Sequence, residues 1–173
     1  MWSENSTKWF VHWKPGTIRR SRSMEKQRTA VMFMGTYEHG IDAKGRVIIP
    51  AKLRDGLGES FVVTIGLDGC LYAYPMNEWE EFLTNLKNLP GTKEARTLQR
   101  TFLSNAATCD CDKQGRTLIP ASLREKVGID KEVVFIGVLG KVEIWSKERY
   151  ESGDEVADID TIADHMSEFG LSF

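Results

Sequence analysis

The chain has 173 residues, of which 28% are charged and 41% hydrophobic, and its formal net charge at pH 7 is −2. This is the composition of a globular protein, and no apolar run approaches the roughly 18–20 residues of a membrane-spanning helix. The three cysteines are an odd number, which argues against a disulfide framework and favours a reducing compartment, the cytoplasm.

The first predicted segment, residues 1–33, is a disordered basic extension. Residues 1–31 carry seven basic and two acidic side chains and show neither helical nor strand periodicity. Two functional interpretations stand beside that one: a basic tail that binds nucleic acid, and a translated stretch upstream of the true start. Regular periodicity begins directly afterwards, so Met32 or Met34 is the expected first residue of the ordered protein.

From residue 36 onward the chain repeats itself. DAKGRVIIPAKLR at 42–54 returns as DKQGRTLIPASLR at 112–124, with eight of the thirteen positions identical. Each copy predicts a strand, a tight turn, a return strand and a short helix that opens at proline. A repeat of roughly 45 residues is near the size limit for an independent core. We therefore expect the two copies to share one core or to lean on other subunits.

The predicted elements alternate short strands with helices. In chain order we expect strands at 36–41 and 46–49, a helix at 50–57, strands at 61–66 and 70–75, helices at 77–89 and 92–105, strands at 106–111 and 116–119, a helix at 120–127, and strands at 133–137 and 142–146. Pro50 and Pro120 are expected at the first helical position, and Asn77 is expected as an N-cap. The predicted fold class is α+β, mainly β.

These elements divide the chain into segments. After the extension come repeat 1 at 36–82, a helical linker at 83–105, repeat 2 at 106–150 and an acidic C-terminal helix at 151–173. The last helix is predicted from apolar residues at helical spacing, namely Ile159, Ile162, Ala163, Met166 and Phe169. Residues 147–173 hold eight acidic and two basic side chains, so charge is segregated along the chain.

The repeated turns carry the candidate functional residues. Asp42 can cap its turn through an Asx-type bond and brace Arg46, while Gly45 permits a left-handed corner. Asp112 and Gly115 are the equivalent bracing residues of the second turn. A purely structural turn explains the aspartates and glycines, but it does not require the basic and polar residues at the tips.

The set of DNA contacts predicted from these turns is Lys44, Arg46, Lys113, Gln114 and Arg116. The local charge is +3 in residues 42–54 and +2 in residues 112–124, and local field rather than net charge attracts a polyanion. A two-stranded ribbon fits the major groove of double-stranded DNA, where Arg and Lys read guanine and Gln reads adenine. Arg54 and Arg124, late in the short helices, are either structural or phosphate-facing.

The sequence offers no constellation for catalysis. Cys109 and Cys111 should face the same side of a strand and could bind zinc together with Cys70 or His39, but the usual C-x-x-C spacing is missing. Buried or inert thiols are the preferred interpretation. No nucleophile signature and no glycine-rich phosphate loop occurs. We therefore predict no catalytic residues, no metal, no cofactor and no small-molecule substrate.

The two D-x-x-G-R turns and the helices that follow them resemble the MraZ family, and the resemblance covers about residues 32–173. It implies two tandem SpoVT/AbrB-like repeats that form a pseudo-dimeric swapped-hairpin β-barrel with flanking helices. It also implies a ring-shaped homo-oligomer and a nucleoid-associated DNA-binding transcriptional regulator. The expected target is direct repeats upstream of the regulator's own division and cell-wall gene cluster, and the expected action is repression. Arg46 and Arg116 occupy the family's motif positions, whereas residues 1–31 depart from its pattern.

A protein-interaction module of the same fold is the alternative. Antitoxins with this fold bind a toxin through an acidic flexible tail, and residues 147–173 are acidic. The helical spacing of apolar residues at 159–169 argues against a free tail.

Overall fold

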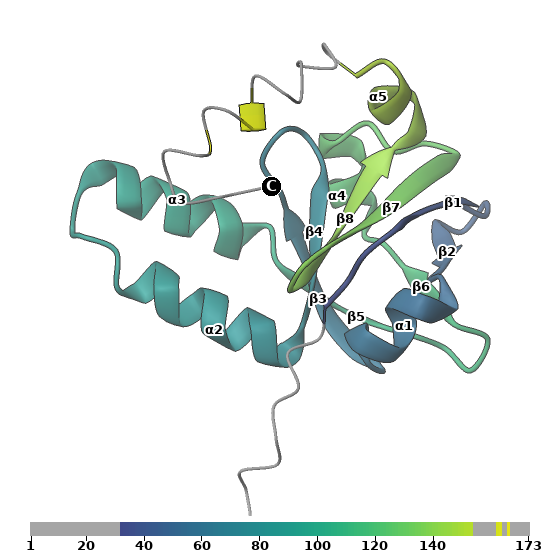
Figure 1. The fold of residues 1–173 in the computed structure, drawn as a ribbon, viewed down its shortest axis with the longest axis horizontal. Coiled ribbons are helices and arrows are strands. Elements are labelled where there is room, and N and C mark those ends of the chain that lie inside the picture. Colours follow the sequence, from purple (N-terminus) through teal and green to yellow (C-terminus); the bar gives the residue numbers. More distant parts are fainter. Residues whose placement is uncertain (1–31, 154–161, 164–165, 167–173) are drawn as a thin grey trace, which may run out of the picture.

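The computed structural model describes residues 32–153, 162–163 and 166 (Figure 1). Its elements in chain order are β1 (Thr36–Gly40), β2 (Arg46–Ile48), α1 (Ala51–Leu57), β3 (Ser60–Ile65), β4 (Leu71–Pro75), α2 (Met76–Lys87), α3 (Lys93–Ser104), β5 (Ala107–Asp110), β6 (Arg116–Leu118), α4 (Ala121–Lys126), β7 (Glu132–Val138), β8 (Lys141–Ser146) and α5 (Lys147–Glu151). The α+β class with mostly short strands is confirmed. The predicted basic extension lies outside the described residues, apart from Met32 and Phe33.

The strands form one antiparallel sheet of six and a separate ribbon of two. The order in the sheet is β1-β7-β8-β4-β3-β5, and the ribbon consists of β2 and β6. Helices α2 and α3 form an antiparallel hairpin that extends away from the sheet, and the ribbon lies toward the opposite end of the molecule (Figure 1). Among the described residues, no helix is long and apolar enough to cross a membrane.

The prediction that each strand forms a hairpin with its own return strand is wrong, because β1 and β2 lie in different sheets. β1 and β2 form no ladder: across the turn, Ile41 bridges Val47 and the Asp42 N–H donates to the Arg46 carbonyl at 2.9 Å. Instead β1 pairs with β7 of the second copy, β5 of the second copy pairs with β3 of the first, and β2 pairs with β6. The reason is that a return strand of only three residues, ended by proline, offers few ladder bonds. Pairing between the copies buries its inward side chain in a larger core.

Both copies contribute to one hydrophobic core, which is one of the two alternatives that the size of the repeat left open. The cluster contains three pairs of residues at equivalent places 70 positions apart, Ile49 with Ile119, Leu53 with Leu123, and Leu57 with Val127. Val47 also belongs to the cluster, and its equivalent in the other copy is the buried Thr117. All eight are at most 3% exposed. Each repeat therefore completes the apolar environment of the other, and burial of this kind is the main stabilising term of a small domain.

Helices α1 and α4 each begin one residue later than predicted, so their prolines precede the first helical residue. Pro50 and Pro120 are the N-cap residues of α1 and α4, with φ near −51° and −53° and extended ψ values of 133° and 135°. Proline fixes φ without a backbone N–H, so it ends the short strand and lets the helix begin at the next residue. Gly58 then ends α1 with φ of 80°, a left-handed conformation that favours glycine.

A second cluster packs beneath the α2–α3 hairpin. It centres on buried Tyr72, Leu86 and Phe102, and the ring of Phe82 stands edge-on to that of Phe102 at 5.1 Å. Asn77 is not the N-cap of α2, because the helix begins at Met76, directly after Pro75. The buried residues of α2 are Trp79 and Leu86. The hairpin therefore adds an aromatic layer to one part of the sheet.

Helix α5 was not predicted, although the repeat contains a signal for it. Lys147 stands 71 residues after Met76, the first residue of α2, so α5 is the short counterpart of that helix. The Lys147 ammonium lies 2.9 Å from a carboxylate oxygen of Glu38 and 3.6 Å from one of Glu132, which connects α5 to β1 and β7. Most of the predicted helix at 151–173 lies outside the described residues; within it Ile162, Ala163 and Met166 are helical.

Replacing Thr117 by valine is expected to stabilise the fold. Among the described residues, the Thr117 hydroxyl is the buried side-chain polar group without a hydrogen-bond partner, and the equivalent residue of the other repeat is already Val47. An unsatisfied buried hydroxyl costs about 1–3 kcal/mol, so Thr117→Val should raise the free energy of unfolding by about 1 kcal/mol in urea titrations at fixed protein concentration.

Thr64 provides the matched control for this substitution. It is also fully buried, but its hydroxyl donates a hydrogen bond to the Phe102 carbonyl at 2.8 Å. Thr64→Val should therefore destabilise the protein. Equal effects of the same sign at both threonines would contradict the assignment of an unsatisfied hydroxyl to Thr117.

Candidate nucleic-acid interface

The first turn is organised around the Asp42 carboxylate. One of its oxygens accepts the backbone N–H groups of Lys44 and Arg46, each at 2.9 Å. The other oxygen accepts Nε of Arg46 at 2.8 Å and lies 2.7 Å from Nη2 of the same guanidinium. The backbone N–H of Arg46 holds the pKa of Asp42 far below its usual range, at about 2, and the guanidinium adds to that effect.

The second turn reproduces this geometry in the other repeat. One Asp112 oxygen accepts the backbone N–H groups of Gln114 and Arg116 at 2.9 Å, and the other is bound by Nε and Nη2 of Arg116 at 2.8 Å. The Arg116 backbone N–H and guanidinium lower the pKa of Asp112 as well. The Asp–Arg brace that the sequence predicted is therefore present in both turns.

The brace uses one edge of each arginine and leaves the other edge available. A guanidinium carries five N–H donors, and in Arg46 and Arg116 one on Nε and one on Nη2 face the aspartate. The remaining donors, on Nη1 and Nη2, form the edge that can bind two acceptors side by side. Both arginine side chains are 32% exposed. A fixed, partly exposed fork of this kind loses little conformational entropy on binding.

Each turn is also covered by an arginine from the other repeat. Gly45 and Gly115 are buried and have φ of 79° and 75°, which favours glycine. A Cβ built on Gly45 would lie 2.7 Å from Nη2 of Arg124, and one built on Gly115 would collide with the guanidinium of Arg54. The sequence left Arg54 and Arg124 as either structural or phosphate-facing. Packing of both side chains against the turns favours the structural role.

Backbone hydrogen bonds tie the turns to the opposite repeat at the same places. Ile49 donates to the Gly115 carbonyl at 2.9 Å, and Ile119 donates to the Gly45 carbonyl at 3.3 Å. Each turn is therefore held from two sides, by its own aspartate and by the other copy. The position of the arginines depends on both repeats at once.

The β2–β6 ribbon places the two turns at its opposite ends. In its antiparallel register Arg46 stands opposite Leu118 and Ile48 stands opposite Arg116. Since side chains alternate along a strand, the two arginines lie diagonally on the same outer face. Lys44, Lys113 and Gln114 are exposed at the tips of the turns. The five predicted contact residues are thus distributed over one ribbon and the turns at its two ends, and the ribbon is built from both repeats and not from two separate hairpins.

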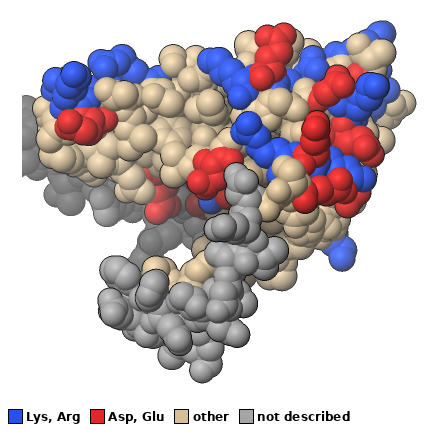
Figure 2. All heavy atoms as spheres, turned by 90° about the horizontal axis from the view of Figure 1, so that it is seen from above, with Lys and Arg blue, Asp and Glu red and all other residues tan. Residues whose placement is uncertain are grey.

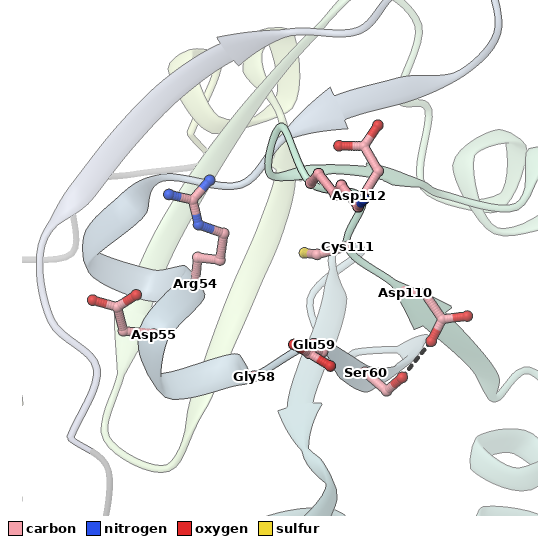
Figure 3. Close-up of a pocket in the computed structure, with 9 residues that line it drawn as sticks. Arg54, Asp55, Gly58, Glu59, Ser60, Asp110, Cys111 and Asp112 are labelled. Atoms are coloured by element: carbon pink, nitrogen blue, oxygen red, sulfur yellow. Dashed lines mark hydrogen bonds between the residues drawn. The ribbon is translucent and has the colours of Figure 1, made fainter.

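Acidic side chains accompany the basic ones around this region. Figure 2 shows Lys and Arg intermixed with Asp and Glu at the end of the molecule opposite the α2–α3 hairpin. A groove of about 620 Å³ beside the second turn is lined by four carboxylates and two basic side chains, namely Asp55, Glu59, Asp110, Asp112, Arg54 and Lys113. In Figure 3 the Ser60 hydroxyl donates a hydrogen bond to Asp110, which stands opposite it on the paired strands β3 and β5. Acidic walls do not suit a phosphate backbone, so the exposed tips and the outer ribbon face are the better candidates for DNA contact.

The cysteines do not form a metal centre in the described part of the chain. No group of three His, Cys, Asp or Glu side chains there could hold a metal ion. Burial raises the pKa of the Cys109 thiol to about 11 and that of Cys70 to about 12, and it raises the pKa of Cys111 too. Thiols with a raised pKa stay protonated at neutral pH and are weak ligands and nucleophiles.

Comparison with known protein families recovers the two copies of the repeat. The family model described as "MraZ protein, putative antitoxin-like" matches residues 32–101 and again residues 102–166, once for each copy of the repeat. The chain belongs to the MraZ family. It is 66% identical over 142 residues to the "Transcriptional regulator MraZ" of Lachnoclostridium phytofermentans, which covers 82% of this chain and 100% of the relative.

Further relatives of the MraZ family show the same coverage. The chain is 54% identical over 142 residues to the protein of the same name from Clostridium beijerinckii, and 54% identical over 143 residues to that from Thermoanaerobacter sp.. In both cases the match covers 81% of this chain and 100% of the relative. All three relatives are named as transcriptional regulators.

Some residues at this interface were missed by the sequence analysis. Ile48 and Leu118 lie on the outer ribbon face between the arginines and are exposed. They occupy the same position of the repeated motif, two residues after each arginine. An aliphatic residue at this position in both copies was the sequence signal that could have identified them. Their exposure could not be recognised without knowing that β2 pairs with β6 and buries only Val47 and Thr117.

The stabilising effect of the Asp42 brace should disappear in acid. Folding lowers the Asp42 pKa from 3.8 to about 2. The carboxylate therefore contributes its full stabilisation above pH 3.8, and this contribution is lost as the pH falls toward 2. The difference in melting temperature between the wild type and Asp42→Asn should be constant above pH 3.8 and shrink below it.

Thermal melts of both proteins across this pH range provide the measurement. Asp130→Asn, at an exposed position before β7, controls for the loss of one negative charge. A melting difference for Asp42→Asn that stays unchanged down to pH 2 would show that the carboxylate is not held as described.

Proposed function

We propose that the chain is a sequence-specific DNA-binding transcriptional regulator without enzymatic activity. It binds direct repeats in double-stranded DNA upstream of its own division and cell-wall gene cluster and acts there as a repressor, in the cytoplasm at the nucleoid. The observation that carries the proposal is the pair of arginines, Arg46 and Arg116, each braced by an aspartate with a free donor edge. The names of the relatives support regulation, and the direct repeats and repression follow from the family resemblance.

The free edge of each arginine suits recognition of guanine. In the major groove guanine presents two adjacent acceptors, O6 and N7, and a bidentate arginine contact to them is the commonest specific contact. The brace leaves donors on Nη1 and Nη2 for this purpose. Lys44, Lys113 and Gln114 at the exposed tips are proposed to complete the contact set, the lysines at phosphates and Gln114 at phosphate or adenine. Asp42, Gly45, Asp112 and Gly115 hold the turns in place.

We further propose that the protein acts as a ring-shaped homo-oligomer. A single subunit neutralises few phosphates and should bind weakly at cellular salt concentration. Identical turns displayed around a ring, on DNA with repeated sites, make the later contacts intramolecular and raise avidity by about 10²–10⁴. Leu98 and Leu103 on α3 remain 40% and 49% exposed, which leaves apolar surface for contacts between subunits.

The exchange of strands between the copies supports the swapped-hairpin β-barrel implied by the family resemblance. On this view the two copies are pseudo-dimeric SpoVT/AbrB-like repeats at 36–82 and 106–150, joined by the helical linker at 83–105. The acidic helix at 151–173 would follow them. Closure of the barrel would require contacts beyond the six-stranded sheet and the ribbon.

An antitoxin-like protein-interaction module is the second candidate. The description of the family as antitoxin-like and the acidic composition of residues 147–173 favour it. A small basic protein that co-purifies with the chain and dissociates after truncation at residue 153 would support this alternative. DNA binding that depends on Arg46 would support the first.

Substitution of Arg46 tests the proposed function directly. Arg46→Ala should nearly abolish binding to a duplex covering the DNA upstream of the chain's own gene, because a bidentate guanine contact contributes about 1–3 kcal/mol of discrimination and every subunit loses it. Affinity is measured by gel shift with non-specific competitor DNA. Melting is measured on the same sample, because loss of the brace to Asp42 could also destabilise the turn.

Two variants separate recognition from charge. Arg46→Lys keeps the charge but loses the fork, so it should retain non-specific binding and lose discrimination. Lys113→Ala should weaken binding to all duplexes alike and lower the salt dependence by about one phosphate contact. Unchanged affinity of a well-folded Arg46→Ala oligomer would overturn the assignment of the first turn as a DNA reader.

Light scattering tests the oligomer. At micromolar concentration the full chain should have a mass several times its own 19.6 kDa, and dilution should lower the mass only gradually. A monomer at every concentration would contradict both the ring and the avidity argument.

A further inference from the structure

The outer face of the β2–β6 ribbon carries two aliphatic side chains beside the two arginines. Val47 and Thr117, the central pair of the ribbon, are each 1% exposed and point into the core. Because side chains alternate, the residues on either side of them point outward. Ile48 is 48% exposed and Leu118 is 55% exposed. In the ribbon Ile48 faces Arg116 and Leu118 faces Arg46.

This placement is not what scattered surface residues would produce. Single exposed aliphatic side chains are common and need no explanation. Here, however, two of them come from segments 70 residues apart, occupy the same position of the repeat and share one face. Each stands directly opposite an arginine that is held by an aspartate. The fold does not need them for the core, since both are exposed.

We propose that Ile48 and Leu118 are specificity-determining residues that contact the 5-methyl groups of thymines in the major groove. The inference rests on the proposed DNA-binding function and deepens it. Thymine is distinguished in that groove by its methyl group, which apolar side chains recognise by contact. A ribbon that places a guanidinium and an aliphatic side chain side by side would read a guanine and a nearby thymine together.

The spacing within the ribbon fits this recognition. Side chains directly opposite on antiparallel strands are about 5 Å apart at Cβ, which corresponds to one or two base-pair steps of about 3.4 Å. The antiparallel register also relates the Arg46–Leu118 pair to the Arg116–Ile48 pair by an approximate two-fold axis through Val47 and Thr117. Each ribbon would thus present the same two-part reader in two orientations.

The charges on this face favour DNA over a second copy of the chain as its occupant. Two copies joined through this face would bring the guanidiniums of Arg46 and Arg116 against those of the partner. A polyanion instead meets the free donor edges of both arginines while the aliphatic side chains bury their exposed surface. Contact between copies through this face is therefore treated as an outcome that would overturn the proposal.

Replacing thymidine by deoxyuridine removes the 5-methyl group and changes nothing else on the base, so this replacement tests the proposed methyl contact. The probes are the duplex upstream of the chain's own gene and the same duplex with deoxyuridine in place of every thymine. The full-length wild type should bind the deoxyuridine duplex about fourfold more weakly for each methyl group that it buries. The Ile48→Ala/Leu118→Ala double variant should bind the thymine duplex more weakly and lose the difference between the two probes.

Leu67→Ala is the matched control, because Leu67 is exposed to a similar degree (57%) but lies between β3 and β4. It should keep the wild-type affinity ratio between the probes. Melting curves and light scattering establish that each variant is folded and has the wild-type mass. If the double variant does not fold, the single variants replace it, and each should lose part of the ratio.

The outcomes separate this inference from the function on which it rests. Wild-type protein that binds both probes equally overturns the thymine contact and leaves the DNA-binding function standing. A double variant that keeps the wild-type ratio shows that the methyl groups act through DNA shape, and this also overturns the inference. A changed mass with an unchanged ratio assigns the two residues to a contact between copies only. Wild-type protein that binds neither probe overturns both proposals.

Discussion

The pairing of strands between the two copies is the constraint on which the rest of the structure depends. A return strand of three residues that ends at proline cannot form a stable hairpin with its own neighbour, because it offers few ladder bonds and little surface for burial. When β2 pairs with β6, Val47 and Thr117 enter a core to which both copies contribute. Each copy thereby supplies the partner strands that the other lacks, and neither would have a complete core alone.

The same exchange positions the candidate site. Gly115 lies against Arg54 and Gly45 lies against Arg124, so each turn is covered from the other repeat. The backbone bonds from Ile49 and Ile119 to the two glycine carbonyls hold the turns at the ends of the ribbon. A substitution at either glycine would disturb the local turn and the packing of the opposite copy together. The stability of the fold and the positions of Arg46 and Arg116 thus depend on the same few contacts.

The aspartates give the arginines a fixed orientation at an exposed surface. A free arginine side chain would lose considerable rotamer entropy on binding, whereas here two donors are already bound to Asp42 or Asp112 in the folded chain. Exposed ion pairs contribute little to stability by themselves. Their consequence is geometric, because they fix one edge of each guanidinium and leave the donors of the other edge outside the ion pair. The arrangement is repeated at both ends of one face, which suits a ligand that is itself periodic.

The sequence alone determined the repeat, the order of the strands and helices apart from α5, and the Asp-Gly-Arg turns, because these follow from local turn chemistry and periodicity. The size of the repeat left two alternatives open, one shared core or support from other subunits. It did not determine which strands pair, because hairpin and exchanged pairings satisfy the same local pattern and differ only in long-range burial. Tertiary structure therefore decided that Arg46 and Arg116 share a face, that Arg54 and Arg124 cover the opposite turns, and that Ile48 and Leu118 are exposed. The start of α2 was also not determined by the sequence. Asn77 was expected as its N-cap, but the helix begins one residue earlier, at Met76, directly after the strand that ends at Pro75.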